Sequence, residues 1–388
     1  MLGRRGFLGT VAGLCVLSAL GASCGKKDGA GPEPAANEWR VGAYLSLSGA
    51  ETQFGKDTQE GTELAVEEIN SKGGVKGKKI KMLFEDDKSN PQEASNKVLQ
   101  LINRDKVVAL LGEVASSRSK AGGIVANRNK IPMISPSSTN PDVTKVGPFV
   151  FRVCFTDDVQ GQTGARFVKE KLNKSKVALL YASDDLYSSG LANEFKNEAK
   201  KLGMTIVVEK SFLKSETNFT TYLNEIKAAE PEAIYAPVYY NAMVPVARQA
   251  KAAGIPGSMF VGGDGWHSDS LVNDAGEEME GAYFTNHFSP DMPSPSSQAF
   301  VKRYVEKYKR EPSALAAQGY DSAMLLFDAM GRAKGDTSEA IRDAIAETKG
   351  FQGATGSITI NAERNAEKPI VIVQIKGKKF TYFDTVTK

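Results

Sequence analysis

Histidine and cysteine are scarce in this 388-residue chain, which contains two of the former and three of the latter. His267 and His287 have no metal-ligand spacing and no cysteine pair beside them, so the sequence predicts no metal site. Each histidine is expected to be a surface or hydrogen-bonding residue. The sequence also lacks a Gly-x-Ser-x-Gly nucleophile elbow and a phosphate-binding P-loop. No nucleophile and base are therefore assembled in the sequence, and no cofactor is indicated.

Net charge is low, and the N-terminal apolar run is short. The formal net charge is +3, and no basic stripe with interleaved aromatic residues occurs, so a nucleic-acid partner is not expected. The apolar run from Val11 to Leu20 is too short to span a bilayer comfortably. An apolar share of 41% and a charged share of 24% are typical of a globular protein, and 388 residues leave room for two domains.

The first residues have the layout of an export signal. Arg4 and Arg5 precede the apolar run, and small residues then lead into Cys24. This layout resembles a bacterial lipoprotein signal, in which Cys24 becomes the lipid-bearing first residue after removal of residues 1–23. The arginine pair is also similar to a twin-arginine signal, and the alternative is a general secretory leader whose arginines are only its positive end. Residues 24–38, rich in Gly, Ala and Pro, are expected to form a flexible tether.

The cysteines fit an exported protein without an internal disulfide. Cys15 would leave with the leader and Cys24 would carry lipid, so Cys154 would remain as a single thiol. Cys154 lies within the apolar run Phe149 to Phe155 and is therefore expected to be a buried structural residue rather than a nucleophile.

Short apolar strands and amphipathic helices alternate through most of the chain. One such run extends from Arg40 to Phe155 and a second from Gln160 to Gly263, and alternation of this kind predicts parallel sheets covered by helices on both faces. The remaining helices and strands must return to complete both units. We expect an α/β fold of two lobes, 39–157 with 288–365 and 158–287 with 366–388, joined by a hinge with several crossovers beside an interlobe cleft.

A polar stretch follows one of the predicted buried strands. Ile131 to Ile134 is a short apolar run, and it continues into Ser-Pro-Ser-Ser-Thr139 and then Asn140-Pro141-Asp142. In open α/β folds, ligands bind at the carboxyl edge of the sheet, and the amides at the start of a helix favour anions such as carboxylate. A capped strand-to-helix turn without a ligand is the alternative, since Ser and Thr are ordinary capping residues.

Acidic residues Glu85-Asp86-Asp87 are the one feature that could suggest an enzyme. Such a run could hold a cation or provide a pair of catalytic acids, but a solvated strand end is the commoner explanation. We therefore interpret the chain as a binding protein and not as an enzyme.

Several short motifs occur in a fixed order along nearly all of the mature chain. They are Gly49 to Gly55, Leu64 to Gly74, Gly77-Lys78, Asp86-Asp87, Ser116-Ser117, Ile134 to Thr139, Phe151-Arg152, Asp157 with Gln160-Gly161, Tyr187, Ala250 to Gly254, and Gly262 to Gly265. In this order they resemble the periplasmic leucine/isoleucine/valine-binding protein family. The resemblance implies the type I periplasmic binding protein fold, with two doubly wound parallel-sheet lobes.

The resemblance also implies a ligand site. The α-carboxylate of an amino acid would be held by Ser116 and by amides around Ser137 and Thr139. The α-ammonium would be held by the carbonyl of Ser137, the hydroxyl of Thr139 and the carboxylate of Asp264. One full negative charge is what an ammonium needs to offset its desolvation.

Four aromatic residues complete the expected site. By the same resemblance Tyr187 and Tyr239 belong to the second lobe and close over the ligand, whereas Phe54 and Trp266 could shape the end of the pocket that holds the ligand side chain. For each of them, packing in the core is an equal alternative.

Three positions depart from the family pattern. Asp264 stands where leucine-type binders usually carry the longer Glu, and Phe54 stands where they often carry Tyr. Ala115 precedes Ser116, so the first-lobe disulfide of some members cannot form.

The resemblance implies a lipoprotein on the periplasmic or cell-surface side of a membrane, anchored through Cys24. It would be a monomer that closes on a branched-chain or other neutral aliphatic amino acid and delivers it to the permease of an ABC importer. The alternative is a ligand-sensing receptor of the same fold for amides, urea or aromatic acids.

Overall fold

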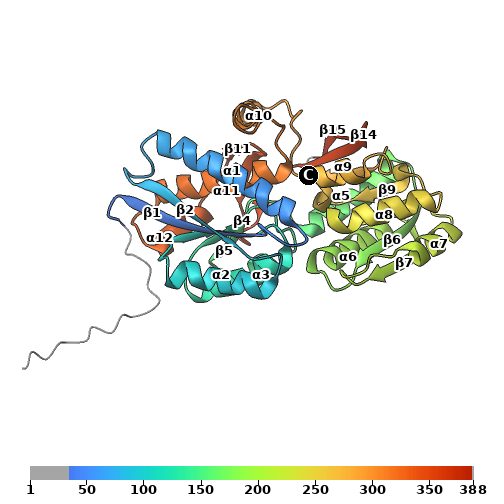
Figure 1. Ribbon diagram of the computed structural model, residues 1–388, viewed down its shortest axis with the longest axis horizontal. Helices are drawn as coiled ribbons and strands as arrows, with labels where there is room; N and C mark the ends of the chain where they lie inside the picture. The colour runs from blue at the N-terminus through green and yellow to red at the C-terminus, as the bar shows by residue number, and fades with distance from the viewer. Residues whose placement is uncertain (1–34, 387–388) are drawn as a thin grey trace, which may run out of the picture.

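The computed structural model describes residues 35–386 (Figure 1). The predicted signal peptide 1–23, Cys24 and most of the predicted tether 24–38 lie outside the described residues. Within them the chain is α/β, as predicted, and Figure 1 shows two lobes side by side. Each lobe contains one large sheet with helices on its faces, and we call them the first and second lobe in chain order.

The sheet of the first lobe has five parallel strands in the order β2-β1-β3-β4-β5. Its strands are β1 (Glu38–Leu45), β2 (Lys79–Asp86), β3 (Ala109–Leu111), β4 (Met133–Ser135) and β5 (Val150–Arg152). Its helices are α1 (Thr52–Ser71), α2 (Pro91–Asn103), α3 (Ser116–Arg128) and the short α4 (Asp142–Lys145). Every residue of β3, β4 and β5 is buried, which is the pattern of a strand covered on both faces.

The sheet of the second lobe has seven strands in the order β15-β14-β10-β9-β8-β6-β7. They are β6 (Lys176–Ala182), β7 (Thr205–Phe212), β8 (Ala233–Tyr235), β9 (Phe260–Gly262), β10 (Tyr283–Asn286), β14 (Ile370–Lys376) and β15 (Lys379–Val386). Strands β6 to β10 are parallel, whereas β14 and β15 run antiparallel to their neighbours. The helices are α5 (Asp157–Arg166), continued by a π-helical turn Phe167–Lys171, and α6 (Leu186–Lys201), α7 (Thr220–Ala228), α8 (Tyr240–Ala252) and α9 (Asp269–Ala275).

The later part of the chain returns to the first lobe before it completes the second sheet. It forms α10 (Pro295–Tyr308), α11 (Ala314–Arg332), α12 (Ser338–Ala346) and a small sheet of β11 (Phe351–Gly353), β12 (Gly356–Ile360) and β13 (Ala366–Glu367). Helix α11 packs along α1 so closely that a Cβ atom at Gly61 would lie 1.9 Å from the carbonyl oxygen of Ala316. The lobes are thus joined by the segments between β5 and α5, between β10 and α10, and between β13 and β14 (Figure 1).

Helix α1 begins earlier than the sequence predicts. The amphipathic pattern of the sequence runs from Thr58 to Asn70 and would leave Ser46 to Gly55 in a loop, but the helix starts at Thr52. Glycine is a poor helix former, yet a Cβ atom at Gly55 would lie 2.1 Å from the carbonyl oxygen of Ser46. Tertiary packing therefore requires glycine here and overrides its helix propensity. The sequence analysis also did not predict strand β10.

Candidate ligand-binding site

The carboxyl ends of β3 and β4 bring two polar segments together in the first lobe. The strands are parallel neighbours, with Leu111 opposite Ile134, so the chain leaves both at the same edge of the sheet. After β3, helix α3 begins at Ser116, and the hydroxyl of Ser116 accepts a hydrogen bond of 3.2 Å from the amide of Asn140. The structure therefore places Ser116 beside the segment that follows β4.

The hydroxyls of that segment fall into two groups. Ser135 and Ser138 have structural partners: the Ser135 hydroxyl accepts from the amide of Ser138 at 3.0 Å, and the Ser138 hydroxyl donates to the carbonyl of Val114 at 2.8 Å. Ser137 and Thr139 are 3% and 1% exposed, and neither hydroxyl makes a hydrogen bond of ordinary geometry within residues 35–386, although the Thr139 hydroxyl is close enough to Asp157 to act on its pKa. Buried polar groups are almost always hydrogen-bonded, so an unpaired pair at a sheet edge indicates a place for a polar ligand. A capped turn explains Ser135 and Ser138 but leaves Ser137 and Thr139 without a role.

The second lobe contributes two tyrosines whose rings lie against each other. Tyr187 lies in the first turn of α6, and Tyr239 immediately precedes α8. The rings stack with centroids 4.8 Å apart and an interplanar angle of 6°, and the hydroxyl of Tyr187 accepts from the amide of Gly265 at 3.1 Å. Burial raises the pKa of both phenols well above the usual range, so they remain neutral.

Asp264 follows β9, and both of its carboxylate oxygens have partners. The side-chain amide of Gln160 donates to Oδ1 at 3.0 Å, and Nε2 of His287 lies 3.0 Å from Oδ2. The backbone amide of Asp264 also donates to the side-chain oxygen Oε1 of Gln160 at 2.9 Å. Asp264 is only 7% exposed, so this carboxylate is both buried and held in one orientation.

A chain of contacts connects Asp264 with the first-lobe hydroxyls. The amide of Asp157 donates to the carbonyl of Thr139 at 2.9 Å, and Asp157 Oδ1 accepts from Gln160 Nε2 at 3.5 Å. Burial raises the pKa of Asp157 well above its usual range, which favours the uncharged carboxyl group. Hydrogen bonds through Asp157 and Gln160 thus connect Thr139 of the first lobe with Asp264 of the second.

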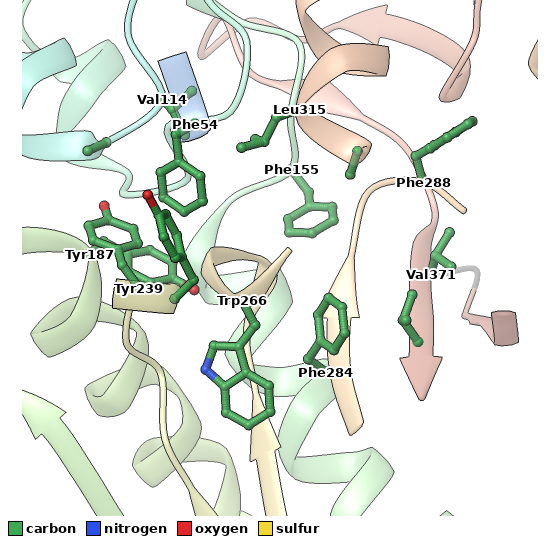
Figure 2. Close-up of a cluster of buried hydrophobic side chains, with 14 of the residues drawn as sticks. Phe54, Val114, Phe155, Tyr187, Tyr239, Trp266, Phe284, Phe288, Leu315 and Val371 are labelled. Atoms are coloured by element: carbon green, nitrogen blue, oxygen red, sulfur yellow. The ribbon is translucent and has the colours of Figure 1, made fainter. Parts of the chain in front are cut away.

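Of the two other aromatic residues singled out in the sequence, only Phe54 lies with the tyrosines. Its ring meets Tyr239 edge-on at a centroid distance of 5.5 Å and Tyr240 at 4.9 Å. Figure 2 shows Phe54, Tyr187 and Tyr239 together, with Trp266 pointing away from them. The indole of Trp266 donates to the carbonyl of Ala236 at 3.1 Å and is fully buried, so it is placed as a core residue of the second lobe.

The acidic run Glu85-Asp86-Asp87 does not form a common site. Glu85 pairs with Lys97 at 2.9 Å on the surface, and Asp86 accepts from the amides of Leu47 and Ser48. Asp87 is buried and accepts from the hydroxyl of Ser46. The three carboxylates have separate structural contacts, and none of these contacts is to the aromatic residues or to Asp264.

The described residues also bear on metal binding and on the single thiol. Residues 35–386 contain no group of three or more His, Cys, Asp or Glu side chains that could hold a metal ion. Cys154 is buried, its thiol donates to the carbonyl of Ser138 at 3.3 Å, and burial raises its pKa to about 12. It is a structural residue, as the apolar run around it indicates.

Two residues beside Asp264 were not expected as site residues. Gln160 belongs to a motif that carries the family resemblance, but no role was assigned to it. His287 directly follows β10, the strand that the sequence analysis did not predict, so nothing placed it at the carboxyl end of a parallel strand beside β9. Recognising Tyr283 to Asn286 as a strand is the signal that would have pointed to His287.

A model of the periplasmic binding protein family matches residues 38–379. The Leu/Ile/Val-binding protein of Escherichia coli is 30% identical over 279 residues, which cover 72% of this chain and 75% of that protein. The chain is a member of the periplasmic leucine/isoleucine/valine-binding protein family. An amino acid binding protein of Pseudomonas aeruginosa is also 30% identical, over 68% of this chain and 71% of its own length.

Solved structures of this family have the same fold. The leucine binding protein LivK of Thermotoga maritima is 35% identical with a TM-score of 0.86, and 90% of this chain matches 99% of that one. LivJ of Streptococcus pneumoniae, in complex with isoleucine, is 34% identical with a TM-score of 0.85 over 90% of this chain and 100% of that one. A solute binding protein of Rhodopseudomonas palustris in complex with benzoate is 25% identical, with a TM-score of 0.81 over 90% and 98% of the two chains. These relatives are binding proteins, and the type I fold predicted from the sequence is confirmed.

Membership of this family implies export to the periplasm. In the part of the chain that the structure describes, no helix has the length and apolar character needed to cross a bilayer.

Proposed function

We propose that this protein is the substrate-binding lipoprotein of an ABC importer and that it closes on a neutral amino acid of the branched-chain class. The observation that carries the proposal is the pairing of two unpartnered hydroxyls, on Ser137 and Thr139, with one oriented carboxylate, on Asp264. This arrangement offers neutral hydrogen-bonding groups and a single negative charge, and both are needed to bind a zwitterion.

The carboxylate of the ligand is proposed to bind at the first lobe. The hydroxyl of Ser116, the amides around Ser137 and Thr139, and the start of α3 lie together at the edge of the sheet. Amides at the start of a helix carry a partial positive charge and stabilise an anion without a full countercharge. An amino-acid carboxylate would therefore be bound without leaving a buried cation behind when the ligand departs.

The ammonium group is proposed to bind between Thr139 and Asp264. The hydroxyl of Thr139 and the carbonyl of Ser137 would accept from it, and Asp264 would provide the compensating charge. Because Asp264 belongs to the second lobe, its contact with the ligand would exist only in the closed form. Closure would then be driven by the ligand through its differential affinity for the closed state.

The ligand side chain would face an apolar surface. Phe54, Tyr187 and Tyr239 form an aromatic group, and Val114 and Leu315 are drawn near Phe54 in Figure 2. Such a lining suits an aliphatic side chain. The R. palustris relative bound to benzoate suggests aromatic acids as a second candidate, since stacked tyrosines could hold a ring. An aromatic acid has no ammonium, however, and would leave the buried charge of Asp264 uncompensated, which favours the amino acid.

We propose residues 1–23 as a signal peptide and Cys24 as the lipid anchor, with the protein acting as a monomer beside its permease. The lobes are proposed as 39–157 with 288–365 and 158–287 with 366–388. A receptor that reports ligand occupancy to a signalling partner is the alternative on the same fold, and it requires the same site.

Thermal denaturation with and without ligand tests the proposal. The mature protein without lipid is screened against amino acids, amides and aromatic acids after refolding from denaturant, which removes any ligand that co-purifies. A ligand at a hundred times its dissociation constant adds about 2.7 kcal/mol to stability, which is readily measured. We expect a shift with leucine, isoleucine or valine. A shift only with amides or aromatic acids would contradict the ammonium site while leaving the transport role intact.

A further inference from the structure

His287 is a buried histidine held in one place beside the candidate site. Its side chain is 1% exposed, and its ring stacks on Phe155 with centroids 3.7 Å apart and an interplanar angle of 27°. Nε2 lies 3.0 Å from Oδ2 of Asp264, while Nδ1 has no hydrogen-bond partner within residues 35–386. Because a carboxylate oxygen can only accept, we assign the imidazole hydrogen to Nε2, which leaves Nδ1 with a lone pair.

The contact with His287 is one half of a clamp on Asp264. Gln160 donates to the other carboxylate oxygen, and the orientation of its side-chain amide is fixed because its oxygen accepts from Thr285 Oγ1 at 2.7 Å and from the amide of Asp264 at 2.9 Å. Gln160 cannot change its charge, whereas His287 can. Asp264 is therefore held by one donor that is always neutral, Gln160, and by one that can become positively charged, His287.

We infer that His287 is a positioning residue of the ligand site, whose neutral form directs the Asp264 charge toward the ligand ammonium and whose protonated form cancels that charge. This inference rests on the proposed function, in which Asp264 binds an ammonium group. With a neutral imidazole the pair of residues carries one negative charge for the ligand. With an imidazolium the pair is neutral, and a bound ammonium would meet a cation at the far side of the carboxylate.

The charged and titratable groups around His287 support this assignment. Asp264 faces it from the segment after β9, Lys368 acts on it from the segment between β13 and β14, and His267 lies near it in the second lobe. Burial lowers the pKa of His287 below its usual value of 6.5, with the Asp264 carboxylate opposing this effect. Burial also lowers the pKa of His267 to about 4 and that of Lys368 to about 8, so neither is centred in the range between pH 5 and 7.

The expected consequence is an affinity that depends on pH. Ligand binding favours the neutral imidazole, so affinity is highest above the pKa that His287 has in the ligand-free protein. It falls as the pH falls through that value, by at most about tenfold per pH unit. Asp157 lies near Asp264 and also titrates, because burial raises its pKa. The experiment must therefore separate these two residues.

Calorimetric titration with L-leucine between about pH 7.5 and pH 5 provides the test, with wild type, His287→Gln and Asp157→Asn compared. Glutamine can donate to Asp264 as the imidazole does but does not titrate. We expect the dissociation constant of wild type and of Asp157→Asn to increase toward pH 5 and that of His287→Gln to change much less. His287→Leu, which removes the donor, should bind more weakly than His287→Gln at pH 7.5.

The outcomes that overturn the inference are distinct from failure of the proposed function. His287 has no such role if the dissociation constants of wild type and His287→Gln depend on pH in the same way. The same conclusion follows if Asp157→Asn is the only variant whose dissociation constant does not change with pH. The imidazole signals in proton–nitrogen correlation spectra give an independent readout, since leucine should lower the pKa of His287 and an unchanged value contradicts the inference. If refolded wild type binds neither leucine nor any other amino acid at pH 7.5, the proposed function itself is wrong and the inference falls with it.

Discussion

The ammonium of Lys214 lies 3.7 Å from the carboxylate of Glu51, and the two residues belong to different lobes. Lys214 also pairs with Asp185 of its own lobe at 3.2 Å, and Glu51 pairs with the buried Arg118 at 2.8 Å. Nearby, the hydroxyl of Tyr240 in the second lobe donates to the carbonyl of Ala50 in the first at 3.3 Å. The lobes are therefore held together by polar contacts as well as by the aromatic group around Phe54.

Lys214→Gln should weaken ligand binding modestly, because it removes an ion pair between the lobes. Lys214 is about one-third exposed, so solvent screens the pair, and we expect a loss of about 0.2–1 kcal/mol. Calorimetry at low and high salt measures the binding free energy, and the difference in binding free energy between variant and wild type should shrink at high salt. Lys210→Gln is the control, because Lys210 pairs with Glu225 within the second lobe. An equal loss in the control would exclude an interlobe effect.

Asp264→Asn should severely reduce affinity for a ligand with an ammonium group. The substitution keeps the shape of the side chain but removes the charge, and loss of one partner of a buried charge pair costs about 2–5 kcal/mol. Calorimetric titration with leucine measures the effect. Asp274→Asn, an exposed position of α9, is the matched control. Unchanged affinity in Asp264→Asn would remove this residue from the site.

Thr139→Val should separate ligand binding from stability. The hydroxyl of Thr139 makes no hydrogen bond of ordinary geometry in the described structure, so its removal should lower the melting temperature of the ligand-free protein only slightly. The increase in melting temperature that the ligand causes should become smaller, by an amount that corresponds to about 1–3 kcal/mol of binding free energy. Thr144→Val is the contrasting variant, because that hydroxyl donates to Asn365 at 3.0 Å. It should lower the melting temperature and leave the ligand-induced shift unchanged, and the reverse pattern would contradict the assignment.

Ionisation of the buried Asp87 should lower the free energy of unfolding as the pH rises. Burial, together with the nearby Glu113 carboxylate, raises its pKa to about 8. The unfolded chain has a carboxyl pKa of about 3.9, so between these values the folded protein holds a proton that the unfolded chain releases. The stability that comes from this proton is fully present below about pH 4 and is lost as the pH rises to about 8.

Asp87→Asn should therefore flatten the fall of the free energy of unfolding across this range, by at most about 1.4 kcal/mol per pH unit. Asparagine can still accept the hydrogen bonds that Asp87 receives from Ser46 and Ser89. Denaturant unfolding at a series of pH values provides the measurement. Asp86→Asn should act in the opposite direction, because hydrogen bonds lower the pKa of Asp86 despite its partial burial, and its stabilising effect is lost only in acid. A profile of Asp87→Asn identical to that of wild type would contradict the prediction.

The sequence was sufficient for the class of fold, and it also indicated which polar segments follow the buried strands. Buried strands such as β3 are apolar throughout, and the polar residues that follow them are visible without a structure. The sequence does not indicate which hydroxyls in this segment are hydrogen-bonded to the protein. Ser135, Ser137, Ser138 and Thr139 are all small hydroxyl residues in the same short stretch. Their difference depends on Val114 and on other residues brought from β3 by the register of the sheet.

Long-range contacts account for the other differences. Trp266 follows Asp264 by two residues, yet the 3₁₀ turn Asp264–Trp266 directs its indole to the carbonyl of Ala236, in the core of the second lobe. His287 reaches Asp264 only because β10 pairs with β9. Neither contact leaves a local signal, since each depends on a residue more than twenty positions away.

The placement of β14 and β15 has a consequence for the order of events during synthesis. The second sheet pairs β10, which ends at Asn286, with β14, which begins at Ile370, so that edge stays unpaired until the ribosome has added the whole intervening segment. Until then the backbone of β10 presents free hydrogen-bonding groups of the kind that recruit other strands. The second lobe can therefore complete its native sheet only once Ile370 to Lys376 is available to pair with β10.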